Sequence, residues 1–147
     1  MLIKTIRTVC IAAAIAVTGA AHAAEVKIGF VTTLTTPAGV IGEDMKNSVE
    51  LALEHIGNKM ANLDVVLIME DDGFKPDIGK QKTDKLVKQD DVDFVAGYIW
   101  SHVLLASAKS VLDADKFLIS ANAGPSQMAG KRCDKNFFST SWQNDRG

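Results

Sequence analysis

From residue 24 onward, short apolar runs alternate with longer stretches in which apolar residues recur every three or four positions. The short runs have the length and the β-branched and aromatic content of strands. The second run is apolar without interruption from Val65 to Ile68, which is typical of a strand buried on both faces. Strands are predicted at residues 26–31, 64–69, 94–97, 117–119 and 137–140.

Three of the intervening stretches have helical spacing. Apolar side chains fall on one helical face in residues 45–56, and Gly57 with Asn58 ends that pattern. Pro76 is suited to the start of a lysine-rich helix at about residues 77–89. A third helix is predicted from Ser101 to about Leu112, with Ser101 as its N-cap.

Strands that alternate with helices of this length predict a mostly parallel sheet with helices on both faces. The expected fold class is therefore α/β, with a doubly wound, flavodoxin-like sheet. We expect the strand order 2-1-3-4-5, in which the order reverses between the first and third strands. In such sheets ligands bind beyond the carboxyl ends of the strands, next to the reversal.

Three polar loops are expected at that edge: residues 32–39, 97–102 and 120–124. They are rich in Thr, Ser, Gly and Asn, which offer hydroxyl and backbone N–H donors. Ser101 also opens a helix, whose first N–H groups suit an anion. Capping of that helix by Ser101 is the equally weighted alternative.

Two aromatic side chains flank this loop, Tyr98 and Trp100, and either could form an apolar wall against a ligand. The alternative is packing in the core, and we expect one of the two to point inward.

The first 23 residues have the features of a secretory signal peptide. Lys4 and Arg7 precede an apolar run over residues 9–17, and the small-x-small sequence at Ala21–Ala23 marks the cleavage site. We therefore expect a signal peptide at residues 1–23 and an exported domain at residues 24–147. An N-terminal membrane anchor is the alternative.

Composition narrows the range of functions. In 147 residues, 16 Lys and Arg stand against 18 Asp and Glu, for a net charge of −2, which excludes a polybasic nucleic-acid binder. Two cysteines exclude a disulfide-dense scaffold and a four-cysteine zinc site. Whether Cys133 pairs is left open.

Motifs for cofactors and catalysis are missing from the sequence. A Gly-rich dinucleotide loop and a G-x-S-x-G elbow are absent, and residues 73–80 lack the spacing of a phosphate loop. His102 follows Ser101 directly, which is not a catalytic pairing. We expect no cofactor, no metal and no enzymatic activity.

Two charged clusters are interpreted as solvated surface. Residues 70–72, Glu-Asp-Asp, could bind a divalent cation, but a solvated turn is the preferred interpretation. The lysines at positions 80, 82, 85 and 88 are interpreted as the solvated face of a helix.

Several short motifs, in this order and spacing, resemble one family. They are Val26-Lys27-Ile28-Gly29, residues 70–73 with Pro76, Val95-Ala96-Gly97 with Ser101, Ile119-Ser120 with Gly124-Pro125, and Phe137-Phe138-Ser139-Thr140. The chain resembles the periplasmic leucine/isoleucine/valine-binding proteins, the type I solute-binding proteins of ABC importers, over nearly all of residues 24–147. Since family members are longer, the resemblance implies the N-terminal lobe of two, without the second lobe.

The resemblance implies a periplasmic protein that captures a small carboxylate and delivers it to ABC permease subunits in the membrane. The implied carboxylate site consists of Ser101, Asn122, Ala123 and Gly124, with Tyr98 or Trp100 against the ligand body. Amino-acid binders have a Thr where this chain has Gly124, so an aromatic acid is an alternative to a branched-chain or hydrophobic amino acid. A ligand-sensing receptor domain of the same fold and an exported enzyme are the further alternatives.

Overall fold

The computed structural model describes residues 24–145. The predicted signal peptide, residues 1–23, lies outside the described residues. Within residues 24–145, no helix has both the length and the apolar content needed to cross a bilayer.

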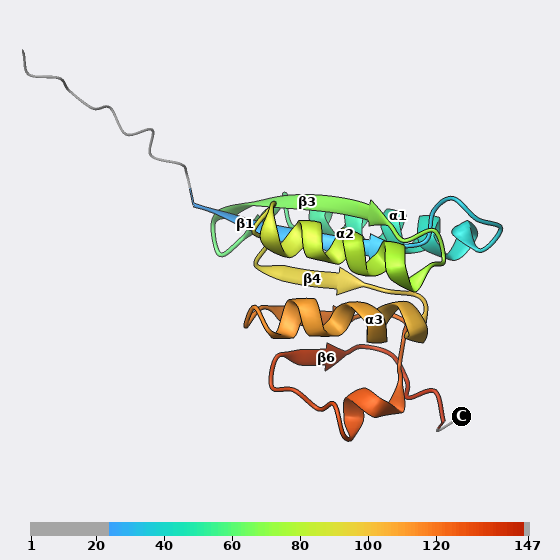
Figure 1. The fold of residues 1–147 in the computed structure, drawn as a ribbon. Coiled ribbons are helices and arrows are strands. Elements are labelled where there is room, and N and C mark those ends of the chain that lie inside the picture. Colours follow the sequence, from blue (N-terminus) through green and yellow to red (C-terminus); the bar gives the residue numbers. More distant parts are fainter. Residues whose placement is uncertain (1–23, 146–147) are drawn as a thin grey trace, which may run out of the picture.

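Six strands form one sheet in the order β2-β3-β1-β4-β5-β6. The strands β3, β1, β4, β5 and β6 pair in parallel, and their arrowheads point the same way in Figure 1. The predicted order 2-1-3-4-5 is confirmed, with one antiparallel edge strand, β2, added beside β3. The strands are β1 (Glu25–Thr32), β2 (Lys59–Met60), β3 (Leu63–Asp71), β4 (Phe94–Gly97), β5 (Phe117–Ser120) and β6 (Phe137–Ser139).

Helices cover both faces of the sheet. The helices α2 (Pro76–Lys88) and α3 (Ser101–Leu112) lie side by side on one face, while α1 (Gly39–His55) lies on the other (Figure 1). The predicted helices end within a residue or so of those observed, except that α1 begins several residues before the expected start. Its first turn packs against the loop after β1, where a Cβ atom on Gly42 would lie 1.8 Å from the Thr33 carbonyl oxygen. A 3₁₀ turn, η1 (Ser126–Ala129), follows β5.

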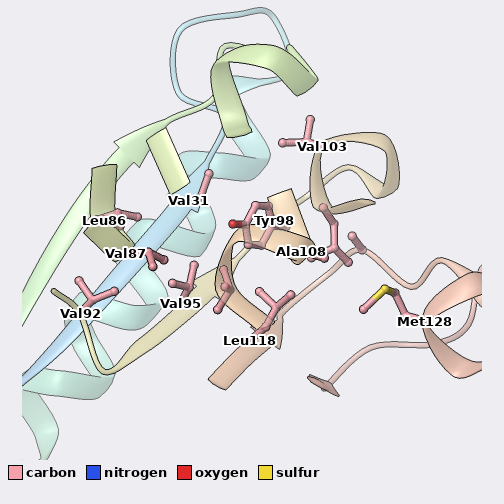
Figure 2. Packing of buried hydrophobic residues seen from close by; sticks show 13 residues of the cluster. Val31, Leu86, Val87, Val92, Val95, Tyr98, Val103, Ala108, Leu118 and Met128 are labelled. Atoms are coloured by element: carbon pink, nitrogen blue, oxygen red, sulfur yellow. The ribbon is translucent and has the colours of Figure 1, made fainter. Parts of the chain in front are cut away.

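The hydrophobic core lies between the sheet and the helix pair α2 and α3. Figure 2 shows Tyr98 near the middle of this cluster, with Val95 and Ala108 around it. The buried members are Val31, Leu86, Val87, Val92, Val95, Tyr98, Val103, Leu104, Ala108, Val111, Leu118, Ala123 and Met128.

A sharp turn at the end of β4 places Tyr98 in this core. Gly97 has φ of 110° and Tyr98 has φ of 61°, both in the left-handed region. The position requires glycine, because a Cβ on Gly97 would lie 2.3 Å from the Val31 carbonyl oxygen. The same carbonyl accepts the Tyr98 N–H at 2.7 Å. The turn therefore breaks the strand alternation and sends the phenol ring inward.

Candidate functional site

The carboxyl ends of the parallel strands share one edge of the sheet, and the described end of the chain lies on the same side (Figure 1). The loops after β1, β3, β4 and β5 therefore meet at this edge. The order reverses at β1, whose two neighbours are β3 and β4. This is the position at which ligands bind in open α/β sheets.

One hydrogen-bonded chain joins three of these loops. The Trp100 indole N–H donates to Thr33 Oγ1 at 2.9 Å, and the Thr33 hydroxyl donates to Asp72 Oδ1 at 2.5 Å. Thr33 and Asp72 are fully buried, whereas Trp100 is half-buried at the edge. The buried carboxylate therefore fixes the position of an aromatic ring at the rim of the site.

The same carboxylate holds a second aromatic residue. Asp72 Oδ1 also accepts the Phe74 N–H at 2.8 Å, and Phe74 has φ of 65°. Its ring packs edge-on against Trp100, with 4.7 Å between centroids, and against His102, with 5.2 Å. Phe74, Trp100 and His102 form an aromatic cluster at the carboxyl edge, and sequence analysis missed its Phe74 member.

The loop after β1 is tied to the end of β3. Asp71 accepts hydrogen bonds from the Leu34 N–H at 2.8 Å and from the Thr35 hydroxyl at 2.5 Å. Burial raises the pKa of the Asp71 carboxyl, but these hydrogen bonds outweigh burial and lower it overall. The Thr35 hydroxyl thus anchors the loop, and its hydrogen is donated to Asp71.

Ser101 is the first residue of α3. Trp100 is the N-cap, and no side chain caps this helix within the described structure, so capping by Ser101 is not observed. The first N–H groups of a helix have no partners within it and carry partial positive charge. The Ser101 hydroxyl lies among them and accepts a hydrogen bond from Asn144 Nδ2 at 2.6 Å.

The segment after β6 crosses the loop that follows β5. The Asn144 N–H donates to the Gly124 carbonyl at 2.8 Å, and a Cβ on Gly124 would lie 1.8 Å from the Trp142 carbonyl oxygen. The absence of a side chain at Gly124 therefore lets this segment approach Ser101. Asn144 was missed by sequence analysis, because only the tertiary structure brings it to the site.

The other two residues of the predicted β5 loop have structural contacts. Asn122 donates its side-chain N–H to the Ile99 carbonyl at 3.0 Å. The Ala123 N–H donates to the Tyr98 carbonyl at 3.0 Å, and Ala123 is buried in the core. The Ala123 N–H is therefore engaged within the fold, and the placement of Ala123 in the carboxylate site stays a prediction. Ser101 and Gly124 remain the predicted residues that the fold brings together at the edge.

Tyr98 is fully buried, so the prediction that it contacts a ligand is wrong. Its hydroxyl lies 2.7 Å from Thr83 Oγ1, which itself donates to the Gly79 carbonyl at 2.8 Å. Burial raises the pKa of the phenol well above its usual value, so Tyr98 stays neutral. Of the two aromatic residues, Tyr98 is the one that points inward.

The acidic run at residues 70–72 is not a solvated turn, because Glu70 and Asp71 are the last two residues of β3. Glu70 is buried and accepts ion pairs from Lys82 at 2.7 Å and Lys85 at 2.8 Å, so two of the predicted solvated lysines are also engaged. Burial raises the pKa of Glu70, but the two lysines more than offset this and lower it. Asp72 is buried as described above. These carboxylates stabilise the fold.

Residues 24–145 contain no group of three or more His, Cys, Asp or Glu side chains placed to hold a metal ion. Cys133 is exposed and is not in a disulfide within that range. Two hollows of about 520 Å³ lie along α2 and between α3 and η1, away from the carboxyl edge. A further, smaller hollow of about 90 Å³ lies beside Gly124, so the carboxyl edge is an open face of the sheet and not a closed pocket.

The sequence matches a known family over most of its length. The profile of the family described as periplasmic binding protein matches residues 25–147. The Leu/Ile/Val-binding protein BraC3 of Rhizobium johnstonii is 30% identical over 125 residues, which cover 84% of this chain and 33% of that relative. The Leu/Ile/Val-binding protein homolog 3 of Brucella melitensis is 30% identical over 144 residues, which cover 95% of this chain and 38% of the relative.

Solved structures have the same fold. A solute-binding protein of an ABC transporter from R. palustris, in complex with benzoate, superposes with a TM-score of 0.78 at 25% identity, covering 82% of this chain and 34% of that one. The branched-chain amino acid substrate-binding protein LivJ from Streptococcus pneumoniae, in complex with isoleucine, gives a TM-score of 0.75 at 20% identity over 82% and 34% of the two chains.

The chain spans about a third of the length of the curated relatives it matches. Its parallel sheet with helices on both faces is the fold of one lobe of a type I periplasmic binding protein. With the profile match over residues 25–147, this shows that the chain belongs to the periplasmic binding protein family.

Proposed function

We propose that this protein is the solute-binding component of an ABC importer and that it captures a small carboxylate. The leading ligand class is a branched-chain or other hydrophobic amino acid. The observation that carries the proposal is the meeting of Ser101 and Gly124 at the carboxyl edge beside the reversal of the sheet, linked through Asn144.

The chemistry of this edge suits an anion. The start of α3 offers N–H groups with partial positive charge, and the Ser101 hydroxyl lies beside them. Gly124 is buried against the segment that carries Asn144, and its N–H donates no hydrogen bond within the described structure. These donors are fixed by the backbone, so they lose little conformational entropy when a carboxylate binds.

Ser101 and His102 are not arranged as a nucleophile and its base. His102 follows Ser101 on the helix, and its ring packs against Phe74 at 5.2 Å. The Ser101 hydroxyl interacts with a neutral amide, Asn144, which is no general base. We propose reversible binding in the periplasm, after removal of residues 1–23, and delivery of the ligand to membrane permease subunits.

An aromatic acid is the second candidate ligand. The observation that favours it is the aromatic cluster of Phe74, Trp100 and His102, whose edge-on packing is fixed by Asp72. Trp100 lies next to Ser101 in the chain, so a planar ligand held at Ser101 would be close to an apolar ring. Benzoate bound by the R. palustris relative is consistent with this chemistry.

Titration calorimetry of the full-length protein tests the proposal, with L-isoleucine and benzoate as probes. We expect at least one acid to bind, and Ser101→Ala to weaken it by about 1–2 kcal/mol, the scale of a hydrogen bond to a charged group. Ser48→Ala is the matched control, because Ser48 lies exposed on α1 and bonds only the Asp44 carbonyl. Absence of binding by both acids, or full affinity in Ser101→Ala, would contradict the proposal.

A further inference from the structure

We propose that Asn144 is a positioning residue that directs the hydroxyl proton of Ser101 toward the ligand. The inference rests on the proposed function and deepens it, because it assigns the site a preference for carboxylates over neutral carboxamides.

The first step is the direction of one hydrogen bond. Asn144 Nδ2 lies 2.6 Å from Ser101 Oγ. An amide nitrogen only donates, so the Ser101 oxygen is the acceptor in this pair. A hydroxyl has a single hydrogen, and here it is not used toward Asn144. That hydrogen is therefore left to donate to another acceptor at the edge of the sheet.

The second step is that the backbone holds Asn144 in place. Its N–H donates to the Gly124 carbonyl at 2.8 Å. Earlier in the same segment, the Thr140 N–H donates to the Ser120 carbonyl at 3.0 Å, and the Trp142 carbonyl lies over Gly124. Residues 140–144 are thus fastened along the β5 loop, and the carboxamide of Asn144 is presented to Ser101.

The third step is the resulting set of donors. The edge offers the Ser101 O–H and the first N–H groups of α3. A carboxylate accepts at both oxygens, whereas a carboxamide presents its own NH₂ donor to a site of donors. Two donors that face each other leave their hydrogens without an acceptor, which costs binding free energy. The site should therefore bind a carboxylate more tightly than the corresponding carboxamide.

The test compares each acid with its amide in the full-length protein, using benzoate with benzamide and L-isoleucine with L-isoleucinamide. Asn144→Ala should weaken the acid about tenfold, the scale of one hydrogen bond to a charged group, and the amide less. Asn144→Asp places a carboxylate beside Ser101 that accepts its proton, so acid binding should fall further and the preference for acid over amide should shrink or reverse. Asn47→Ala, an exposed position on α1, is the control.

A double-mutant cycle separates positioning from simple support of the fold. If Asn144 acts through Ser101, adding Asn144→Ala to Ser101→Ala should weaken the acid by less than about twofold, since coupled residues are not additive. Thermal melting checks that each variant folds.

Each outcome decides the inference. Equal losses for acid and amide in both Asn144 variants, additive losses in the cycle, or unchanged affinity in Asn144→Ala would each overturn the positioning role while leaving the proposed function standing. Failure of the unmodified protein to bind either acid would overturn the proposed function, and the positioning role with it.

Discussion

The indole N–H of Trp100 donates to the hydroxyl oxygen of Thr33 at 2.9 Å, across the point where the strand order reverses. Because the Thr33 hydroxyl donates in turn to the buried Asp72, one carboxylate sets the relative positions of the loops after β1, β3 and β4. The rim of the site is therefore fixed before any ligand arrives.

Thr33→Val should destabilise the protein by roughly 1–3 kcal/mol, because it leaves the buried Asp72 oxygen without its hydroxyl donor. The Trp100 ring should also become more mobile, which the position and width of its fluorescence emission would report after Trp142→Phe removes the other, exposed tryptophan. Urea unfolding gives the stability.

Thr36→Val serves as the control for that change, since the Thr36 hydroxyl accepts one longer bond, from the Ala38 N–H at 3.3 Å. Equal stability losses for the two valine variants would show that the hydrogen bond from Thr33 to Asp72 stabilises the protein no more than the longer bond to Thr36 does.

Tyr98→Phe should lower the free energy of unfolding by about 1 kcal/mol without changing ligand affinity, because the hydroxyl bonds Thr83 inside the core. The Thr83 hydroxyl keeps its bond to the Gly79 carbonyl, which limits the loss. Unfolding and calorimetry on the same preparation measure both quantities. A drop in ligand affinity with an unchanged free energy of unfolding would show instead that Tyr98 contacts the ligand.

Gly124→Ala should disturb both the fold and the site. Its added Cβ would lie 1.8 Å from the Trp142 carbonyl, so residues 142–144 must move and Asn144 must leave Ser101. We expect a loss of roughly 1–3 kcal/mol in stability, the usual cost of overpacking, together with weaker carboxylate binding. Gly130→Ala is the control, since its nearest neighbour would lie at 3.6 Å. Native affinity in Gly124→Ala would show that the segment does not need its present position.

Acid should weaken the fold in part through Glu70. Its pKa in the folded protein lies below the ordinary value of 4.5, so near that pH the unfolded chain binds more protons than the folded one. The stabilisation is present above pH 4.5 and is lost as the pH falls through the folded-state pKa. Urea unfolding from pH 7 to pH 3 should show a steeper decline for the unmodified protein than for Glu70→Gln.

At pH 7 Glu70→Gln should lower the free energy of unfolding by only about 1 kcal/mol. The loss is small because Lys82 and Lys85 are both partly exposed, so water screens their attraction to Glu70. Parallel pH profiles for the two proteins would refute the role of Glu70 in acid unfolding.

The apolar patterns of the sequence determined the architecture. The five parallel strands, their order and the three helices were predicted, because burial on both faces and helical crossovers leave strong periodic signals, whereas the edge strand β2 and the first residues of α1 were not. The same order placed Ser101 and the β5 loop at one edge.

Which residues can contact a ligand at the carboxyl edge of the sheet was decided only by the tertiary structure. Strand alternation cannot anticipate the left-handed turn at Gly97 and Tyr98, which sent the phenol into the core. Nor does a run of acidic residues show that Glu70 and Asp72 are buried, since their partners come from other elements. Asn144 reaches Ser101 across 43 positions of chain, a contact that depends on close packing over Gly124 and leaves no local pattern.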